Sequence, residues 1–208
     1  MKTRLLIQND PHALSLAVEL LQSGEVVAFP TDTVYGIGVR ADSEDAIEKL
    51  YQIKARSFDK PIPVMVAAVG QLEQVAGTVP ASARRLAARF WPGPLTMVLP
   101  KRAGLPDNLT HLPGVGVRIP DHPFALDLLK RCGPLAVTSA NLSGQPEALC
   151  AKKVLAQLEG LLALMVDGGD SPGGTASTVV DLTGTKPCIL REGPISAEMI
   201  TQALIKPA

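Results

Sequence analysis

The sequence has 208 residues, with 20 Lys and Arg against 20 Asp and Glu, so its formal net charge is zero at pH 7. This balance argues against a protein that binds nucleic acid by bulk attraction, because neutralising phosphates requires an excess of Lys and Arg, although it leaves room for a locally positive cleft. With 46% hydrophobic and only 3% aromatic residues, the chain can bury a substantial core that must be mostly aliphatic.

The first predicted elements alternate between strand and helix, over residues 3–7, 10–24, 25–29 and 42–54. Asp10 and Pro11 are typical of a helix start and Gly24 of a helix end, and Lys54 lies where the second helix should stop. Further strands are predicted over 62–67, 95–100, 115–120, 134–139, 162–167, 177–182 and 188–192. Further helices are predicted over 80–90, 123–131, 151–158 and 196–205. This pattern predicts an α/β fold with a mixed sheet. No repeat or linker interrupts the chain, so we expect one domain over residues 1–208.

The cysteines Cys132, Cys150 and Cys188 are far apart and odd in number, which indicates reduced, buried thiols rather than disulfides or a zinc site. The three histidines are equally scattered, so a transition metal held by the protein is not expected. No apolar run reaches membrane-spanning length, and the first residues lack the apolar core of a signal peptide. These features predict a cytoplasmic protein without membrane contact.

The first polar cluster is FPTDTVYGIG, residues 29–38, which directly follows a predicted strand. Its threonines, its aspartate and Tyr35 are candidate ligand contacts, because sites form where strands end. Gly36 and Gly38 permit a close approach of the backbone to a ligand. The alternative is an ordinary turn that Asp32 and Thr33 cap.

The second cluster, YQIKARSFDKPIP, spans residues 51–63. Arg56 offers a planar fork suited to phosphate, and Lys54 and Lys60 offer point charges. Charge alone favours a solvated loop over an anion site.

Two more clusters lie further along the chain. In VTSANLSGQP, residues 137–146, Ser139 and Asn141 can donate hydrogen bonds to phosphate or ribose oxygens without adding charge, although Ser, Asn and Gly also build ordinary turns. In GGDSPGGTASTVVD, residues 168–181, four glycines precede another strand and suggest either a flexible cover or a loop close to a ligand. Arg118 lies within a strand of valine and isoleucine. A lone arginine in a strand is more often a surface residue, but these apolar neighbours are compatible with a paired arginine that points inward. Arg191 lies at the end of another apolar run.

The sequence contains no GxSxG elbow, no HExxH motif, no Cys–His pair and no close carboxylate pair. Nucleophilic and metallohydrolase chemistry therefore lack candidate residues. Cations together with neutral donors suit phosphoryl or nucleotidyl transfer, in which catalysis is mostly positioning and charge neutralisation. The residues alone predict a protein that binds a nucleotide or a phosphate ester.

Taken together, the segments resemble the YrdC-type threonylcarbamoyl-AMP synthases. The shared motifs occur in the family's order and spacing, and they are FPTDTVYGIG, KAR, FWPGPLT, VGVRIP, SAN, STVVD and REG. The resemblance covers Leu6 to Ile205. Because the chain ends near Ala208, we expect the short form, which lacks the extra C-terminal domain of longer relatives.

The resemblance implies a single-domain, open and twisted mixed sheet with flanking helices and a positively charged concave cavity. It also implies a reaction in which L-threonine, bicarbonate and ATP give L-threonylcarbamoyladenylate and pyrophosphate. A partner transferase complex would then use the adenylate to form threonylcarbamoyladenosine in tRNA. Mg²⁺ is expected to arrive with ATP, without a dedicated protein site.

The resemblance also assigns roles to residues. Lys54 and Arg56 are implied as electrostatic catalysts. The residues implied to bind ATP are Lys54, Arg56, Lys60, Ser139, Asn141 and Arg191. Those implied to hold or line the L-threonine site are Thr31, Thr33, Tyr35, Arg118 and Ser177. The sequence departs from the family at Lys60, where relatives often have Asn, and at Met65, where a His is common.

Two alternatives remain at this point. One is a YrdC-like module that binds double-stranded RNA or tRNA without catalysis, for which Arg84, Arg85 and Arg89 could extend a basic surface. The other is a related carbamoyl-adenylate enzyme of hydrogenase maturation. Such enzymes normally carry zinc-finger and acylphosphatase parts, and this sequence shows no motifs for them.

Overall fold

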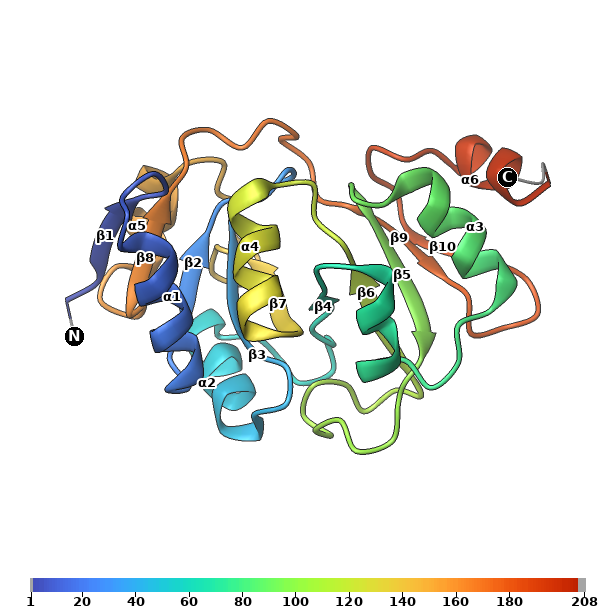
Figure 1. The fold of residues 1–208 in the computed structure, drawn as a ribbon, viewed down its shortest axis with the longest axis horizontal. Coiled ribbons are helices and arrows are strands. Elements are labelled where there is room, and N and C mark those ends of the chain that lie inside the picture. Colours follow the sequence, from blue (N-terminus) through green and yellow to red (C-terminus); the bar gives the residue numbers. More distant parts are fainter. Residues whose placement is uncertain (1, 206–208) are drawn as a thin grey trace.

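A ten-stranded sheet organises the molecule in the computed structural model, which describes residues 2–205 (Figure 1). The strand order is β1-β8-β2-β3-β7-β4-β6-β5-β9-β10. The strands are β1 (Arg4–Ile7), β2 (Val27–Phe29), β3 (Gly36–Arg40), β4 (Val64–Met65), β5 (Leu95–Pro100), β6 (Gly114–Arg118), β7 (Leu135–Ser139), β8 (Leu164–Asp167), β9 (Thr178–Asp181) and β10 (Cys188–Arg191). The helices are α1 (Ala13–Gln22), α2 (Glu44–Lys54), α3 (Ala81–Phe90), α4 (Pro123–Cys132), α5 (Ala151–Leu158) and α6 (Ala197–Ile205), with a 3₁₀ helix η1 (Val69–Gln74).

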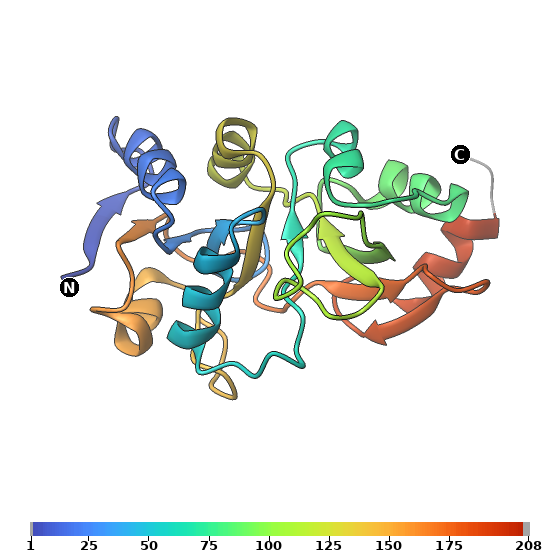
Figure 2. The same cartoon turned by 90° about the horizontal axis from the view of Figure 1, so that it is seen from below.

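The sheet mixes parallel and antiparallel pairs, as the sequence predicted. β1–β8, β2–β8, β4–β6 and β5–β9 are parallel, and the other neighbours are antiparallel. The helices lie on both sides. In Figure 2, α1 and α4 lie on the opposite side of the sheet from α2 and α5. None of the helices among residues 2–205 is long and apolar enough to cross a membrane.

The two-residue strand β4 sits at the middle of the sheet, between β6 and β7. The sequence predicted a longer strand over 62–67, but the ladder to β7 includes only Val64 and Met65. Pro63 contributes just its carbonyl, which accepts the Val137 amide at 2.9 Å, because proline has no amide hydrogen to donate. Thr138 and Ser139, further along β7, are therefore left without a paired residue on β4.

Strand β3 is the strand that sequence reasoning missed. Its first three residues, GIG, were interpreted as part of a polar cluster near a ligand, yet the strand pairs with β2 and β7. A Cβ at Gly38 would lie 3.1 Å from atoms of both Phe29 and Val137. Gly38 therefore serves close packing within the sheet, one of the ordinary reasons for glycine inside a strand.

Candidate functional site

A small cavity of about 140 Å³ opens beside β4, where the two halves of the sheet meet. Its wall combines hydroxyl-bearing side chains with three arginines and one carboxylate. The lining residues are Thr31, Thr33, Val34, Tyr35, Gly36, Arg56, Pro63, Met65, Thr96, Arg118, Val137, Thr138, Ser139, Glu147, Ala176, Ser177 and Arg191. Eight of these were predicted as site residues, from segments spread between positions 31 and 191.

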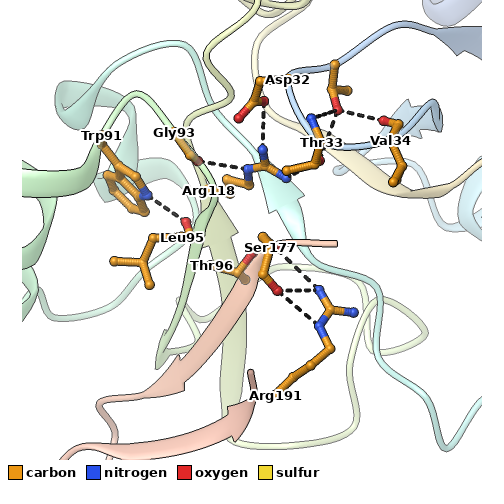
Figure 3. Close-up of polar contacts among 11 residues, drawn as sticks. Asp32, Thr33, Val34, Trp91, Gly93, Leu95, Thr96, Arg118, Ser177 and Arg191 are labelled. Atoms are coloured by element: carbon orange, nitrogen blue, oxygen red, sulfur yellow. Dashed lines mark hydrogen bonds and ion pairs between the residues drawn. The ribbon is translucent and has the colours of Figure 1, made fainter. Parts of the chain in front are cut away.

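Arg118, the last residue of β6, is the most firmly held of the three arginines (Figure 3). Its guanidinium donates to Asp32 Oδ1 at 2.6 Å, to Thr33 Oγ1 at 2.9 Å and to the Gly93 carbonyl at 3.0 Å. The side chain is 5% exposed and that of Asp32 is 12% exposed. Burial lowers the pKa of Arg118, and the Asp32 charge opposes that shift. Arg118 therefore presents a fixed positive group to the cavity.

The segment that contains Asp32 is both a turn and a cavity wall. Thr31 Oγ1 donates to the Val34 carbonyl at 2.6 Å and accepts the Thr33 amide at 3.2 Å. Thr31 is thus the residue that caps the turn, while Asp32 pairs with Arg118. Tyr35 donates from its hydroxyl to the Gly169 carbonyl at 2.6 Å, and burial raises its pKa to about 12.

Arg191 is the last residue of β10, the edge strand at the opposite edge of the sheet from β1. Its side chain lines the same cavity. Its Nε and Nη2 donate to the Ser177 carbonyl at 3.0 and 2.8 Å. Ser177 Oγ lies 2.8 Å from Thr96 Oγ1. In the view of Figure 3, these two side chains lie between Arg118 and Arg191. Thr96 was not predicted, because a single threonine in an apolar strand gives no signal of a site.

Arg56 owes its position to the end of α2. Ala55 adopts a left-handed conformation with φ 47°, which ends the helix after Lys54. The Arg56 guanidinium then donates to the carbonyls of Lys60 and Pro61 at 2.9 and 3.0 Å. The loop therefore holds Arg56 through its backbone. The Lys60 side chain is exposed and does not line the cavity.

Lys54 occupies a different place from the one expected for a residue on a nucleotide phosphate. It is 1% exposed and does not line the cavity. Its ammonium donates to the carbonyls of Ser139 and Asn141, and Asn141 Oδ1 lies at 3.4 Å. The Lys54 carbonyl accepts the Ser143 amide at 3.0 Å. Lys54 thus stabilises the turn after β7 through hydrogen bonds to its backbone, without lining the cavity.

Asn141 takes part in the same internal network and likewise does not line the cavity. Its amide nitrogen donates to the carbonyls of Leu142 and Gln145, at 3.0 and 2.7 Å. Of the four residues predicted on phosphates from the K-x-R and S-x-N pairs, Arg56 and Ser139 line the cavity and the other two support it.

Substitution of Lys54 should change how stability depends on pH. Burial lowers the pKa of Lys54 to about 7 from its ordinary 10.5, helped by the charge of Arg56 and opposed by Glu147. Between these values the folded chain has released the proton and the unfolded chain still binds it, so the free energy of unfolding rises with pH. We expect wild type to gain stability relative to Lys54→Met between about pH 6 and about pH 9 in urea unfolding.

Lys153→Met, which removes an exposed lysine, is the control and should keep a constant difference from wild type. Parallel pH profiles for wild type and Lys54→Met would contradict the prediction.

A second and larger cavity, of about 450 Å³, adjoins the first and shares Arg56, Pro63, Thr96 and Arg191 with it. Its remaining wall is more apolar. These lining residues are Pro61, Val98, Leu112, Pro113, Gly114, Gly116, Val179, Asp181, Thr183 and Leu190. Two arginines therefore stand at the junction of a small polar cavity and a larger apolar one.

Comparison with known proteins adds independent findings. The Sua5/yciO/yrdC family model, described as telomere recombination, matches residues 19–193. The chain is 45% identical over 205 residues to a threonylcarbamoyl-AMP synthase of Bacillus subtilis, covering 97% of this chain and 59% of that protein. It is 41% identical over 189 residues to a putative threonylcarbamoyl-AMP synthase of Mycobacterium tuberculosis, covering 90% and 87%.

Among solved structures, the chain matches P. abyssi Sua5 complexed with L-threonine, with a TM-score of 0.93 and 38% identity. That match covers 98% of this chain and 61% of the other. The chain thus spans about three fifths of the length of its Bacillus and Pyrococcus relatives.

Proposed function

The chain belongs to the Sua5/YciO/YrdC family, and we propose that it is an L-threonylcarbamoyladenylate synthase, a nucleotidyltransferase that joins L-threonine, bicarbonate and ATP. The observation that carries this proposal is the position of Arg56 and Arg191, which belong to both cavities. A reaction between an amino acid and a nucleotide needs two adjoining sites with cations at their junction. The names of the relatives support the same reaction.

In this proposal the small cavity takes L-threonine. Its volume of about 140 Å³ lies below the ~300–1,000 Å³ typical of pockets for drug-sized ligands. Arg118 would bind the carboxylate, because a guanidinium matches a carboxylate with two parallel hydrogen bonds. The neighbouring hydroxyls would orient the rest of the amino acid, and they belong to Thr31, Thr33, Tyr35 and Ser177.

ATP would lie across the junction. Arg56 and Arg191 would face the triphosphate, with Ser139 as a neutral donor, and the more apolar cavity would receive the nucleoside. Mg²⁺ would enter as MgATP and neutralise part of the phosphate charge. Lys60 remains a proposed nucleotide contact that requires its exposed side chain to turn inward. Lys54 and Asn141 would act as positioning residues that fix the turn carrying Ser139.

The chemistry follows from charge. The threonine amine and bicarbonate form a carbamate with loss of water, and a carbamate oxygen attacks the α-phosphorus while pyrophosphate leaves. Because carbamate and triphosphate repel each other, the wall must supply fixed positive charge where the new bond forms. The arginines would do this without a protein nucleophile.

The test is pyrophosphate release with ATP and bicarbonate, with L-threonine or L-serine as the amino acid. We expect release that requires threonine and bicarbonate together and yields an adenylate that retains the α-phosphate. No threonine-dependent release would overturn the proposal. Salt-sensitive binding of tRNA or double-stranded RNA without any ATP consumption would instead favour the RNA-binding alternative.

The synthase proposal also implies a place of action. The adenylate would pass to a transferase complex that modifies tRNA, so we propose the cytoplasm as the location. Reconstitution with such a complex should give threonylcarbamoyladenosine in tRNA only when this chain is present.

A further inference from the structure

Glu147 is the one acidic side chain among the described residues that line the small cavity. We propose that the Glu147 carboxylate receives the ammonium group of the amino-acid substrate, so that the cavity recognises both charges of a zwitterion. This inference rests on the proposed function and assigns a residue that neither the motifs nor the predicted site residues included.

The backbone around Glu147 is held on both sides. The preceding carbonyl, of Pro146, accepts Gln157 Nε2 at 3.2 Å, and the following one, of Ala148, accepts the Tyr35 amide at 3.0 Å. The second bond ties the segment of Glu147 to the turn before β3, which also lines the cavity. The carboxylate is therefore presented by a fixed segment, which reduces the entropy that ligand binding must overcome.

The carboxylate is also free to bind a cation. The ion pairs among residues 2–205 do not include Glu147. Its charge nevertheless acts on its surroundings, since it raises the pKa of Lys54 and of Arg191 against the effect of burial. Lys54 and Arg191 donate to oxygen atoms of Ser139, Asn141 and Ser177 and not to this carboxylate, which leaves it available to a cationic ligand. The amino acid carries such a cation, the ammonium, while Arg118 is placed for its carboxylate.

The pairing acts on binding and not on the chemical step. When the ammonium becomes a carbamate, its charge changes from positive to negative, so attraction by Glu147 turns into repulsion. An interaction that is stronger in the ground state than in the transition state lowers KM without raising kcat. We therefore expect the contribution of Glu147 to appear in L-threonine binding.

The experiment measures L-threonine binding by calorimetry without nucleotide, for wild type, Glu147→Gln and the control Glu159→Gln. Glu159 is exposed, outside both cavities, and its substitution makes the same change in net charge. We expect Glu147→Gln to raise the Kd for L-threonine about 10- to 100-fold, the loss of one charge-assisted hydrogen bond. Binding of 2,3-dihydroxybutanoate, which has a hydroxyl in place of the ammonium, should not change.

The possible outcomes separate the two proposals. Equal L-threonine affinity in wild type and Glu147→Gln would overturn the role of Glu147 and leave the synthase proposal standing. An unchanged Kd for L-threonine together with weaker MgATP binding, measured in a separate titration, would also overturn it, and would assign the carboxylate to the metal of the nucleotide. Wild type that neither binds L-threonine nor releases pyrophosphate with it would overturn both.

Discussion

Arg56→Ala is expected to lower kcat/KM for threonine-dependent pyrophosphate release by about 100-fold or more, the usual effect of removing one preorganised donor from developing charge. Arg56 lines both cavities, as Arg191 does, so in the proposed reaction it would face the triphosphate at the junction. Thermal unfolding should change little, because the carbonyls that Arg56 now contacts, of Lys60 and Pro61, lie in a surface loop that water can reach.

Two further variants show whether the loss of activity comes from the guanidinium of Arg56 itself. Arg56→Lys keeps the charge but loses the planar fork, and should recover only part of the activity. Arg131→Ala removes an exposed arginine of α4 outside both cavities and should behave as wild type. Near-normal turnover in Arg56→Ala, with its fold intact, would exclude Arg56 from the reaction.

Much of the fold could be predicted because its signals are local. Of the elements within residues 2–205, apolar runs and helix boundaries located nine of the ten strands and the six α-helices to within a few residues. The exception was β3, whose glycines have a role that only the packing of Phe29 and Val137 reveals. The strand order, in which β1 pairs with β8 and β5 with β9, depends on contacts between distant segments and was not predicted.

The site, like the fold, could be predicted where the signal lies in neighbouring residues and not where it depends on contacts between distant segments. Motifs identified the chemical type of most lining residues, but they could not tell which side chains face the cavity. Lys54 and Arg56 are two positions apart, yet one is buried behind the S-x-N turn and the other lines the cavity. The left-handed backbone at Ala55 separates them. Glu147 was missed because a single carboxylate in a loop of Gly, Gln and Pro resembles an ordinary solvated residue.

Substitution in the Arg118–Asp32 pair should lower both the stability of the fold and the affinity for L-threonine, whereas substitution of Arg56 should lower activity alone. Asp32→Asn keeps the shape of the side chain and leaves a buried guanidinium without its counter-charge. Breaking a buried ion pair on one side typically costs about 3–5 kcal/mol, which corresponds to about 6–20 °C in the unfolding temperature of a chain of this size. We expect a loss of this order in thermal unfolding, together with weaker binding of L-threonine, because Asp32 accepts from Arg118 at 2.6 Å and so holds the guanidinium where it would meet the substrate carboxylate.

The double variant Asp32→Asn with Arg118→Met tests the cause. A flexible apolar side chain can fill much of the arginine's space, and a neutral pair carries no unpaired charge. The double variant should therefore be more stable than the sum of the two single losses predicts, since residues in direct contact do not act additively. L-threonine binding should nevertheless be lost in the double variant, because Arg118 no longer supplies a cation for the carboxylate. If the single losses simply add, the pair does not contribute to stability as a unit. If binding returns in the double variant, Arg118 is not the carboxylate site, and a second cation such as Arg191 would have to take that role.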